Sequence, residues 1–460
     1  MEAKQNDFTK NSMAHNILSL SIPMTLAQMV NVLYSLVDRM YIGHLANEST
    51  LALTGLGITF PIIMIVTAFA NLIGMGGAPL CSIARGKGDD EFAEAVIGNS
   101  FTLLIIFSVI LTIVCLLYKH KLLYLFGASK ETYPYANDFF SIYTLGNLFV
   151  MIGLGLNSFI NAQGFAKKGM LTILIGAVLN IILDPIFIFV LDMGIKGAAT
   201  ATVIAQFVSA LWILHFLLSD KAIYRLKWKY CKLKFNLVKQ ILSLGMSGFV
   251  FSVTNSLVQI ACNTTLLAWG GNIYVGIMTV LNAIREVLQM PLNGIRSGAQ
   301  PVIGFNYGAG ENLRVRQGIK FLTIVSLIYT LISWAILAMF PRAFIHLFNS
   351  EEEMLILGVP ALHIYFFGFF MMAFQSAGQT VFVSLGMGNY ATFFSLFRKV
   401  ILVVPLTLWL PTVWNFGVDG VFYAELISNF VGGAACFITM MFVVWRKLGK
   451  KNNTLKKVDI

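Results

Sequence analysis

The sequence predicts an all-α integral membrane protein with twelve transmembrane helices in two pseudo-symmetric six-helix bundles. Three observations predict this fold class. First, the 460 residues are 57% apolar with a mean hydropathy of +0.78, and only 12% are charged, against roughly 25% in soluble domains. Second, the apolar stretches are about 20 residues or longer, enough to cross a bilayer core of roughly 30 Å. Third, motifs of the first half recur in the second half.

The internal repeat is visible residue by residue. Residues 17–20 (ILSL) return unchanged as residues 241–244. The other recurring pairs, with the first-half member first, are Pro79 and Pro301, Gly86 and Gly308, Gly88 and Gly310, Gly194 and Gly417, and Gly197 and Gly420. All pairs are 222 to 224 residues apart, about half of the chain. A duplicated and strongly apolar chain is typical of a secondary transporter.

Each half is predicted to hold six helical spans. Short alternation of the β type is absent from the sequence, so helices must satisfy the backbone polar groups in lipid. The first six spans are expected at residues 15–42, 52–83, 93–118, 134–163, 168–190 and 196–219. The second six are expected at residues 237–269, 273–305, 314–340, 354–386, 390–414 and 418–445.

The connections between spans repeat as well. Residues 85–91 (RGKGDDE) place glycines at the end of the second span and acids on the first turn of the third. Glycine suits a helix C-terminus, and acids suit the positive end of the next helix. Residues 306–311 (NYGAGE) repeat this arrangement between the eighth and ninth spans. We interpret both connections as tight turns.

Basic residues lie mainly on one side of the predicted membrane. Of the 32 Lys and Arg residues, 24 lie in the termini and in the connections after even-numbered spans, and five lie on the other side. The positive-inside rule therefore predicts that both termini are cytoplasmic. The net charge of +11 reflects this topology, and binding of nucleic acid is not expected.

Four segments follow from these patterns: an N-terminal lobe (1–219), a basic linker (220–239), a C-terminal lobe (240–445) and a basic cytoplasmic tail (446–460). The linker carries seven basic residues with interleaved aromatics. We interpret it as an amphipathic helix on anionic headgroups, with a regulatory docking site as the alternative. Because six is an even number of spans, the two repeats run parallel, and the lobes are expected to face each other across a central cleft.

Asp184 is the first candidate for chemistry inside the membrane. It lies among apolar residues in the stretch 179–187 (LNIILDPIF), and an ionisable side chain inside a bilayer is by default a functional candidate. Asn180, four residues earlier, shares its helical face. Pro185 favours a kink that would free carbonyl groups to bind a cation. The structural alternative is an Asp that caps a broken helix or pairs with a neighbour.

Asp38, late in the first span, is the second candidate. Neither Asp38 nor Asp184 has an acidic partner at the matching position of the second half. This asymmetry indicates where an ion could couple. The structural alternative is that Asp38 and Arg39 are a charged pair near a helix end that reaches the interface.

The other charged residues within spans are interpreted structurally. Arg285 and Glu286 lie near the middle of the eighth span and are expected to pair with other helices. Arg296 and Arg398 are expected to extend to the cytoplasmic interface. No role follows from the sequence for Glu425.

Motifs of enzymes and metal sites are absent from the sequence. There is no G-x-x-x-x-G-K-[ST] loop for ATP and no H-E-x-x-H. The five cysteines are scattered and are interpreted as packing residues. A membrane-embedded enzyme is therefore disfavoured, and no cofactor is expected. A cleft lined by some of the 20 methionines and 38 phenylalanines would suit varied apolar ligands.

Three stretches resemble signatures of the multidrug and toxic compound extrusion (MATE) family. They are residues 298–309 (GAQPVIGFNYGA), the pattern Asn180-x-x-Leu183-Asp184-Pro185, and residues 27–28 (AQ) followed by residues 37–43 (VDRMYIG). The resemblance covers essentially the whole chain. It is strongest to the bacterial DinF-like branch and, within it, to MepA-like multidrug exporters.

The resemblance implies an antiporter of the bacterial inner (plasma) membrane that exports cationic amphipathic drugs and toxins by alternating access. The coupling ion would be H⁺ or Na⁺, the substrates small organic cations, and the state a monomer. The residues that match the family's N-lobe ion site are Asp38, Asn180, Asp184, Thr202, Asn157 and Tyr143. The first four of these would form the site if the ion is Na⁺. Pro23 matches the family's bending proline, and Asn31, Glu286 and Met290 are candidates for the substrate cavity.

Two further inferences follow from the resemblance. Some branches use acids in the seventh and tenth spans, where this chain has Asn255, Gln259, Gln375 and Gln379, so a second acidic ion site is not expected. The alternative function is a lipid-linked oligosaccharide flippase of the same superfamily. Such relatives have a more cationic central cavity or additional helices, whereas only Arg285 is clearly deep in the predicted spans of this chain.

Overall fold

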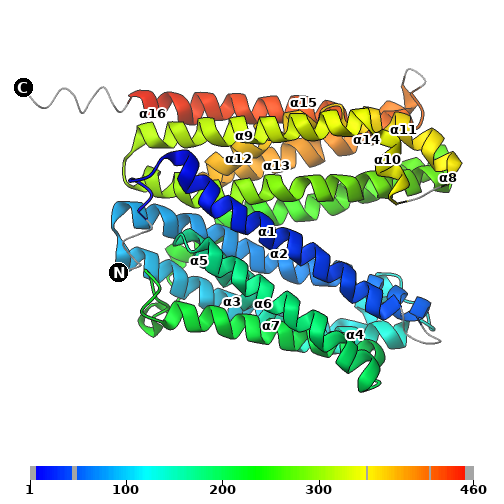
Figure 1. Cartoon of the computed structure of the whole chain (residues 1–460), viewed down its shortest axis with the longest axis horizontal. Helices are drawn as coiled ribbons and strands as arrows, with labels where there is room; N and C mark the ends of the chain where they lie inside the picture. The colour runs from blue at the N-terminus through cyan, green and yellow to red at the C-terminus, as the bar shows by residue number, and fades with distance from the viewer. Residues whose placement is uncertain (1–6, 44–48, 349–350, 414–415, 451–460) are drawn as a thin grey trace, which may run out of the picture. The chain divides into compact units, whose positions relative to one another are not determined.

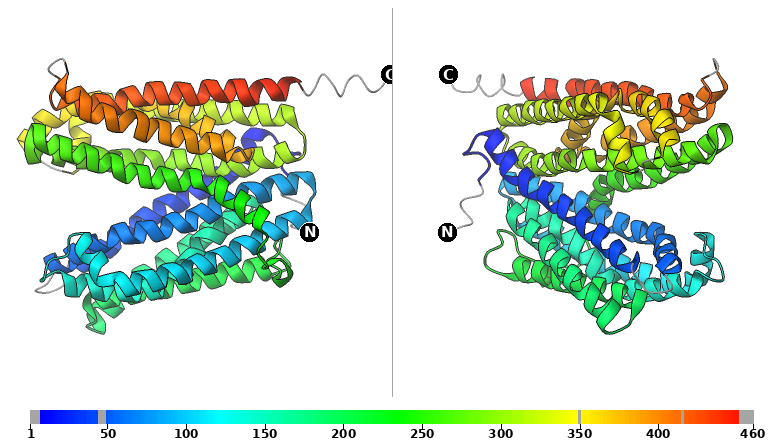
Figure 2. Two further views of the ribbon diagram at one scale, coloured as in Figure 1. Left: turned by 180° about the vertical axis from the view of Figure 1, so that it is seen from behind. Right: turned by 45° about the vertical axis from the view of Figure 1, so that its right-hand side comes forward.

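The computed structural model describes residues 7–43, 49–348, 351–413 and 416–450 and is almost entirely helical there (Figures 1 and 2). The chain divides into two compact units. Among the described residues, the first unit contains 22–245, and the second contains 8–21 and 246–450. Each unit corresponds closely to one half of the repeat.

The helices of the first half follow the predicted spans. In chain order they are α1 (Met13–Gly43), α2 (Ser49–Lys87), α3 (Asp90–Leu125), α4 (Tyr133–Leu145), α5 (Asn147–Ala162), α6 (Ala166–Pro185), the π-helix η2 (Ile186–Val190) and α7 (Gly194–Leu218). The 3₁₀ turn η3 (Trp228–Tyr230) then precedes α8 (Phe235–Gly308).

The helices of the second half are more interrupted. In chain order they are α9 (Asn312–Met339), α10 (Pro341–His346), α11 (Glu352–Phe366), η4 (Phe369–Met371), α12 (Met372–Ser384), α13 (Gly388–Leu396), the π-helix η5 (Phe397–Val403), α14 (Val404–Trp409), η6 (Leu410–Thr412), α15 (Asp419–Met440), the π-helix η7 (Met441–Trp445) and α16 (Arg446–Lys450).

The number of spans agrees with the prediction. Ten helical segments of the described residues are long and apolar enough to cross a membrane, and the pair α4–α5, bent by 56°, forms an eleventh. The 74-residue α8 contains one residue with non-helical dihedral angles, Gly271 (φ 72°, ψ −168°). Straight, α8 would measure about 110 Å, over three times the bilayer core, so it must cross twice. Dividing it at Gly271, between the predicted seventh and eighth spans, gives twelve.

Helix packing repeats between the two units. In the first unit α5 packs against α3 and α7, and in the second α12 packs against α9 and α15. Similarly, α6 packs against α7, as η5 and α14 pack against α15. The structure therefore confirms two bundles with a common internal arrangement, as the recurring motifs predicted.

The exposed face of α1 is strongly apolar. Six apolar side chains, each between 47% and 61% exposed, recur every three or four residues: Ile22, Leu26, Met29, Leu33, Leu36 and Met40. This spacing forms one continuous apolar stripe along a helix. A stripe of this length exposed on a helix requires an apolar environment.

The turn between α2 and α3 has the predicted geometry. Gly88 has φ 73°, and Asp89 caps α3 by accepting a hydrogen bond from the N–H of Phe92 at 3.0 Å. In the second half Gly310 likewise has φ 77°, but Glu311 makes no side-chain cap. The left-handed glycine is therefore the conserved part of the repeated turn, and the acidic cap is not.

The linker is not the amphipathic helix that the sequence predicted. Apart from η3 it is irregular until α8 begins at Phe235. The amide of Asn99 in α3 explains this conformation: it donates to the carbonyls of Tyr230 (3.0 Å) and Lys232 (3.4 Å) and accepts from the N–H of Lys234 (2.8 Å). Because side chains of α3 satisfy these backbone groups, the segment does not need helical hydrogen bonds.

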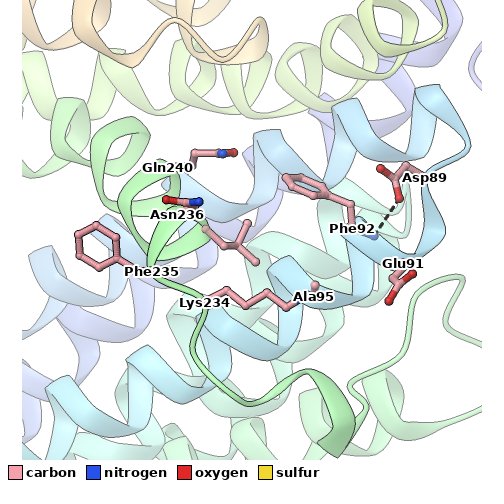
Figure 3. Close-up of a pocket in the computed structure, with 9 residues that line it drawn as sticks. Asp89, Glu91, Phe92, Ala95, Lys234, Phe235, Asn236 and Gln240 are labelled. Carbon is pink, nitrogen blue, oxygen red and sulfur yellow. Dashed lines mark hydrogen bonds between the residues drawn. The ribbon is translucent and has the colours of Figure 1, made fainter.

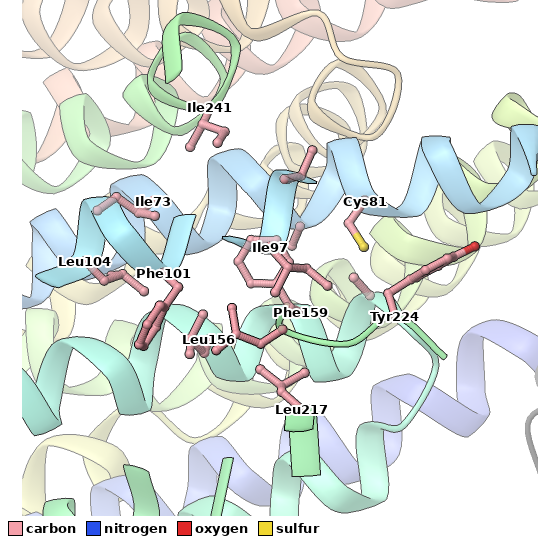
Figure 4. Close-up of a cluster of buried hydrophobic side chains, with 14 of the residues drawn as sticks. Ile73, Cys81, Ile97, Phe101, Leu104, Leu156, Phe159, Leu217, Tyr224 and Ile241 are labelled. Atoms are coloured by element: carbon pink, nitrogen blue, oxygen red, sulfur yellow. The ribbon is translucent and has the colours of Figure 1, made fainter. Parts of the chain in front are cut away.

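The linker packs on the first unit through its buried aromatic residues. Tyr224 donates a hydrogen bond from its hydroxyl to Asp90 at 2.9 Å, and burial, followed by this hydrogen bond, raises the pKa of Tyr224. Figure 4 shows Tyr224 with Phe159, Leu217 and Ile241 around one apolar core. The first unit thus extends past the predicted boundary at residue 219 and includes the start of α8.

Two close helix crossings occupy related positions in the two units. A Cβ at Gly76 of α2 would collide with the backbone of Ile241 and Gly245 in α8. A Cβ at Gly298 of α8 would collide with the backbone of Ser21 in α1. The chain passes from one unit to the other immediately after Ser21 and after Gly245. Glycine is required at both crossings because main chains touch there.

Candidate functional site

The predicted irregularity at Pro185 is present in the structure. α6 ends at Pro185 and continues as the five-residue π-helix η2. A proline removes one backbone donor, and a π turn inserts an extra residue into the helical ladder. Short π segments inside helices are frequent at functional sites. This one directly follows Asp184.

Asp184, Asn180 and Thr202 are brought together in the first unit. The amide nitrogen of Asn180 donates to Oδ1 of Asp184 at 3.0 Å and lies 3.4 Å from Oγ1 of Thr202. Thr202, on α7, donates its own hydroxyl proton to the carbonyl of Ala198 at 2.9 Å. Asp184 is fully buried and Asn180 is 2% exposed. The three side chains form a polar cluster between two apolar helices.

Asp38 completes the cluster from α1. Its carboxyl group interacts electrostatically with that of Asp184 and lies within hydrogen-bonding range of it. Two carboxyl groups can share a hydrogen bond only when a proton lies between them, and two ionised carboxylates at this range repel each other. Uptake of a proton or a cation would relieve this repulsion, so the pair favours binding of one.

Tyr34 is a member of the cluster that the sequence analysis did not single out. It lies one turn before Asp38 on α1 and is within electrostatic range of both Asp38 and Asp184. It is also within range of Tyr143 of α4. The spacing of four residues from Asp38 was the available signal, since residues i and i+4 share a helical face.

Two buried oxygens of the cluster accept no hydrogen bond from any described residue. They are Oδ2 of Asp184 and Oδ1 of Asn180. A buried acceptor without a donor costs about 1–3 kcal/mol, and an isolated buried charge costs more. A proton or a cation at this place would remove both penalties. The arrangement of carboxylate, amide and hydroxyl oxygens thus fits a monovalent cation as well as a proton.

Tyr143 and Asn157 lie at different distances from this cluster. Tyr143 is buried, stacks on Phe139 with ring centroids 6.0 Å apart, and reaches the cluster through Tyr34. Asn157 of α5 instead donates to the carbonyl of Gly169 at 3.3 Å. Gly169 precedes Asn180 by 11 residues on α6, about 16 Å along the helix axis. The structure therefore places Asn157 away from the Asp184 cluster.

Of the remaining predicted residues, Pro23 is buried and the other three are more accessible. α1 is a continuous helix through Pro23. Asn31 and Glu286 are exposed, and Met290 is partly buried. These positions remain predictions for the substrate path.

The second unit holds a buried charged cluster that the sequence analysis did not foresee. One oxygen of Glu425 (Oε1) lies 2.5 Å from Arg398, 3.2 Å from Arg285 and 3.5 Å from Lys399. The ion pair predicted for Arg285 is confirmed. The expectation that Arg398 extends to the interface is wrong, because it is 2% exposed and also donates to Asn429 at 2.6 Å. The interaction with Glu425 holds it inside the lobe.

No group of three or more His, Cys, Asp or Glu side chains that could hold a metal ion occurs among the described residues. A pocket of about 420 Å³ lies elsewhere in the first unit, between the start of α3 and the start of α8 (Figure 3). Asp89, Glu91, Lys234 and Gln240 are among its lining residues. It does not include any predicted site residue.

The fold and the site define a class of protein: a multi-pass membrane transporter with two repeated helix bundles and one buried acidic cluster. The MatE family model matches residues 23–186 and 249–409 of the chain. The chain therefore belongs to the MatE family, which confirms the resemblance inferred from its motifs. Its members are multidrug transporters, not enzymes.

Curated relatives match along nearly the whole chain. The multidrug export protein MepA of Staphylococcus haemolyticus (strain JCSC1435) is 22% identical over 440 residues, covering 95% of this chain and 94% of that protein. MepA of Staphylococcus aureus (strain MSSA476) is 22% identical over 442 residues, with 95% of each chain covered.

Solved structures share the fold. A MATE transporter in the bent conformation has a TM-score of 0.91 at 24% identity, covering 97% of this chain and 99% of that one. An outward-facing multidrug resistance MATE family transporter of the MOP superfamily has a TM-score of 0.88 at 24% identity, with 96% and 98% covered. At these identities the similarity establishes the fold.

Proposed function

We propose that this protein is a cation-coupled antiporter that exports cationic amphipathic drugs and toxins by alternating access, with H⁺ or Na⁺ as the coupling ion. The observation that carries the proposal is the cluster of Asp38, Asp184, Asn180 and Thr202. It brings two acids together inside an apolar bundle and leaves buried oxygens without donors. Such a group favours binding of a cation and its release when the surroundings change.

The cluster gives a physical reason for exchange. In the ion-free state the two carboxyl groups provide negative charge that attracts a cationic drug. When one proton or Na⁺ binds between Asp38 and Asp184, the charge of the pair falls from −2 to −1, the attraction for the cationic drug weakens, and the drug is released. Ion and drug need not occupy the same place, because it suffices that each disfavours the state that the other prefers. Pro23 of α1 is the proposed position where the helix that carries Asp38 bends.

The comparisons support the drug class and the conformational change. The curated relatives are described as multidrug export proteins, and solved relatives have been captured in a bent and in a straight conformation. Two conformations of one fold support a change of shape in this chain as well, which the proposed mechanism needs. We further propose that the protein is a monomer in the bacterial plasma membrane. The distribution of basic residues supports the proposed cytoplasmic placement of both termini.

A lipid-linked oligosaccharide flippase is the second candidate. The observation that favours it is the buried cationic cluster of the second unit, which makes this half more cationic than the sequence indicated. However, Arg398 and Lys399 have side chains that are only 3% exposed. A bulky pyrophosphate headgroup would have to displace Glu425 to reach them, so export of cations is the better supported function.

Ethidium efflux from reconstituted vesicles tests the proposal. A pH gradient and a Na⁺ gradient are imposed separately on wild type and on Asp184→Asn. We expect efflux under one gradient in wild type and its loss in the variant, because an amide at position 184 cannot take up a proton or carry the charge that binds Na⁺. Efflux by Asp184→Asn at the wild-type rate, with equal protein per vesicle, would contradict the assignment.

Asp138→Asn is a matched control for this experiment. Asp138 lies in the same unit, on α4, and forms a partly exposed ion pair with Lys196 at 3.4 Å. Exposed ion pairs contribute about 0–1 kcal/mol. The same Asp to Asn change at this position should therefore leave gradient-driven efflux close to wild type.

A further inference from the structure

The charged cluster of the second unit lies at the structural counterpart of the acidic cluster. The packing fixes the register: a Cβ at Gly197 would meet the backbone of Phe187, and one at Gly420 would meet that of Leu410. The two members of each pair are 223 residues apart. The same offset matches Asp184 to Thr407 and Thr202 to Glu425. The offset of 224 in the first span matches Asp38 to Cys262.

The counterpart residues occupy equivalent positions. Sγ of Cys262 lies 3.9 Å from Oγ1 of Thr407, so the replacements for Asp38 and Asp184 also touch. Both are buried, with Thr407 at 0% and Cys262 at 2% exposure. Each unit therefore has one polar site built from the same three helices of its repeat. The first has two acids, and the second has exchanged both of them for uncharged residues.

The second site has an excess of positive charge. Arg285, Arg398 and Lys399 all converge on Oε1 of Glu425, which is the only acid interacting with them among the described residues. With all four groups ionised the formal net charge is +2. Nε of Arg398 is buried and donates to no described residue, so this N–H donor has no acceptor among them. A bare charge of this size inside a bilayer is strongly unfavourable.

Lys399 is the member that can relieve this excess. Arginine stays protonated in proteins, whereas a buried lysine can lose its proton. Lys399 is 2% exposed and lies in the π-helix η5. It follows the start of its span, Gly388, by 11 residues, about 16 Å along the helix axis. Since the bilayer core is roughly 30 Å thick, Lys399 lies near its middle. The titratable groups that face it are Arg398 on its own segment, Glu425 on α15, and Arg285 and Cys262 on α8. Tyr365 of α11 faces Arg285.

We propose that the second unit contains a second proton-binding site, in which the ammonium group of Lys399 releases its proton to water and regains it during the transport cycle. This inference rests on the proposed ion-coupled export. Without the Lys399 proton the cluster carries a net charge of +1, and with it +2. Protonation at the acidic site and at Lys399 changes the charge in the same direction. Both events therefore disfavour a bound cationic drug, and both are reversed when protons leave.

Proton counting on purified protein tests the proposal without transport. Wild type, Lys399→Met and Lys399→Arg are titrated with a pH indicator between about pH 5.5 and 8.5, a window in which ordinary lysines with a pKa near 10.4 do not titrate. We expect each variant to bind about one proton fewer than wild type in this window, because Met carries no proton and Arg never loses it. Lys119→Met is the matched control, since Lys119 lies in the first unit, is partly exposed and donates a hydrogen bond to Ser141 at 3.4 Å.

Two different substitutions of Lys399 guard against a variant that does not fold. If Lys399→Met does not fold, Lys399→Arg retains the positive charge and still removes the titrating group. Proton counts in Lys399→Arg equal to wild type would overturn the proposal. So would binding of labelled chloride that is lost in Lys399→Met, which would make the cluster an anion site. Asp184→Asn, titrated in parallel, reports on the acidic site alone, so failure of the two assignments can be told apart.

Discussion

At the scale of single residues, the acidic cluster combines what sequence spacing can predict with what only the fold provides. Asn180 and Asp184 are four residues apart, and the structure joins them by a 3.0 Å hydrogen bond. The link from Asn180 to Thr202 spans 22 residues and depends on α6 packing against α7. No local pattern fixes such a contact. Only the resemblance to the MATE family predicted that Thr202 belongs to the site.

The burial of Arg398 was unpredictable for the same reason. A basic residue in an apolar span often reaches the interface, and the partner of Arg398, Glu425, lies 27 residues further along the chain. Only the contact between η5 and α15 brings the two together. Tyr34 differs, because its spacing from Asp38 was visible in the sequence and its significance followed once Asp38 was placed beside Asp184.

Thr202→Val tests the cluster at this scale. The change keeps the shape of the side chain but removes the hydroxyl oxygen that lies 3.4 Å from the Asn180 amide. We expect the concentration of coupling ion needed for half-maximal efflux to rise about fivefold, corresponding to the loss of one hydrogen bond of about 1 kcal/mol. Ion-dependent ethidium efflux from vesicles measures it.

Thr200→Val is its control on the same helix. Thr200 also donates its hydroxyl proton to a backbone carbonyl four residues earlier, that of Lys196 at 2.8 Å, but Thr200 is partly exposed and lies outside the cluster. An equal shift in Thr200→Val would show that the effect is a general consequence of altering α7, and the role of Thr202 in the ion site would be rejected.

At the scale of elements, helical spans were predictable because apolar length and glycine or proline positions are local properties. The predicted break between residues 269 and 273 coincides with Gly271, whose backbone conformation only glycine adopts without strain. The linker was not predictable as an irregular segment. Its conformation is set by Asn99, more than 130 residues earlier in the chain, and not by its own amphipathic pattern.

Asn99→Ala tests how the linker is held. The change removes the side-chain partners of Tyr230, Lys232 and Lys234, so the segment should detach more often from α3. We expect trypsin to cleave after the linker lysines severalfold faster, with a loss of stability of about 1–3 kcal/mol for the unpaired buried groups. Limited proteolysis in detergent, followed by mass analysis, measures this.

The corresponding control is Asn236→Ala. Asn236 is exposed at the beginning of α8 and lines the pocket of Figure 3. It is close to the same cleavage sites without holding the linker backbone. Faster cleavage in Asn236→Ala than in Asn99→Ala would contradict the role given to Asn99.

At the scale of the whole molecule, the two units share a packing scheme but not a chemistry. Both place a polar site among the same three repeated helices, and in the second unit Arg285 joins it from the part of α8 that follows Gly271. In the first unit the site holds two acids, and in the second it holds three basic residues around one glutamate. Duplication explains the common positions, which recurring glycines and prolines made visible in the sequence. The divergence of the two sites became visible only when tertiary contacts aligned them.

The helix crossing at Gly76 allows a test of the duplicated architecture. A Cβ there would meet the backbone of α8, which cannot move aside as a side chain can. We expect Gly76→Ala to lower the free energy of unfolding by about 1–3 kcal/mol, the usual cost of overpacking. Gly57 lies on the same helix with open space around its Cβ position. Gly57→Ala should be neutral or stabilise the helix by about 0.5–1 kcal/mol.

Thermal unfolding of the purified variants, followed by fluorescence, compares the two substitutions directly. Equal midpoints for Gly76→Ala and Gly57→Ala would show that the close approach between α2 and α8 carries no energetic cost. The proposed reason for glycine at this crossing would then be wrong.

The most direct test of the account as a whole is the affinity of purified protein for ethidium as pH is lowered or Na⁺ is added. Linkage requires that an ion which drives the drug off also binds less well when the drug is present. We predict that one of these ions weakens ethidium binding at least tenfold in wild type. Asp184→Asn should bind ethidium weakly at all pH and Na⁺ values. If Asp184→Asn keeps the wild-type dependence on the ion, the acidic cluster is not the coupling site.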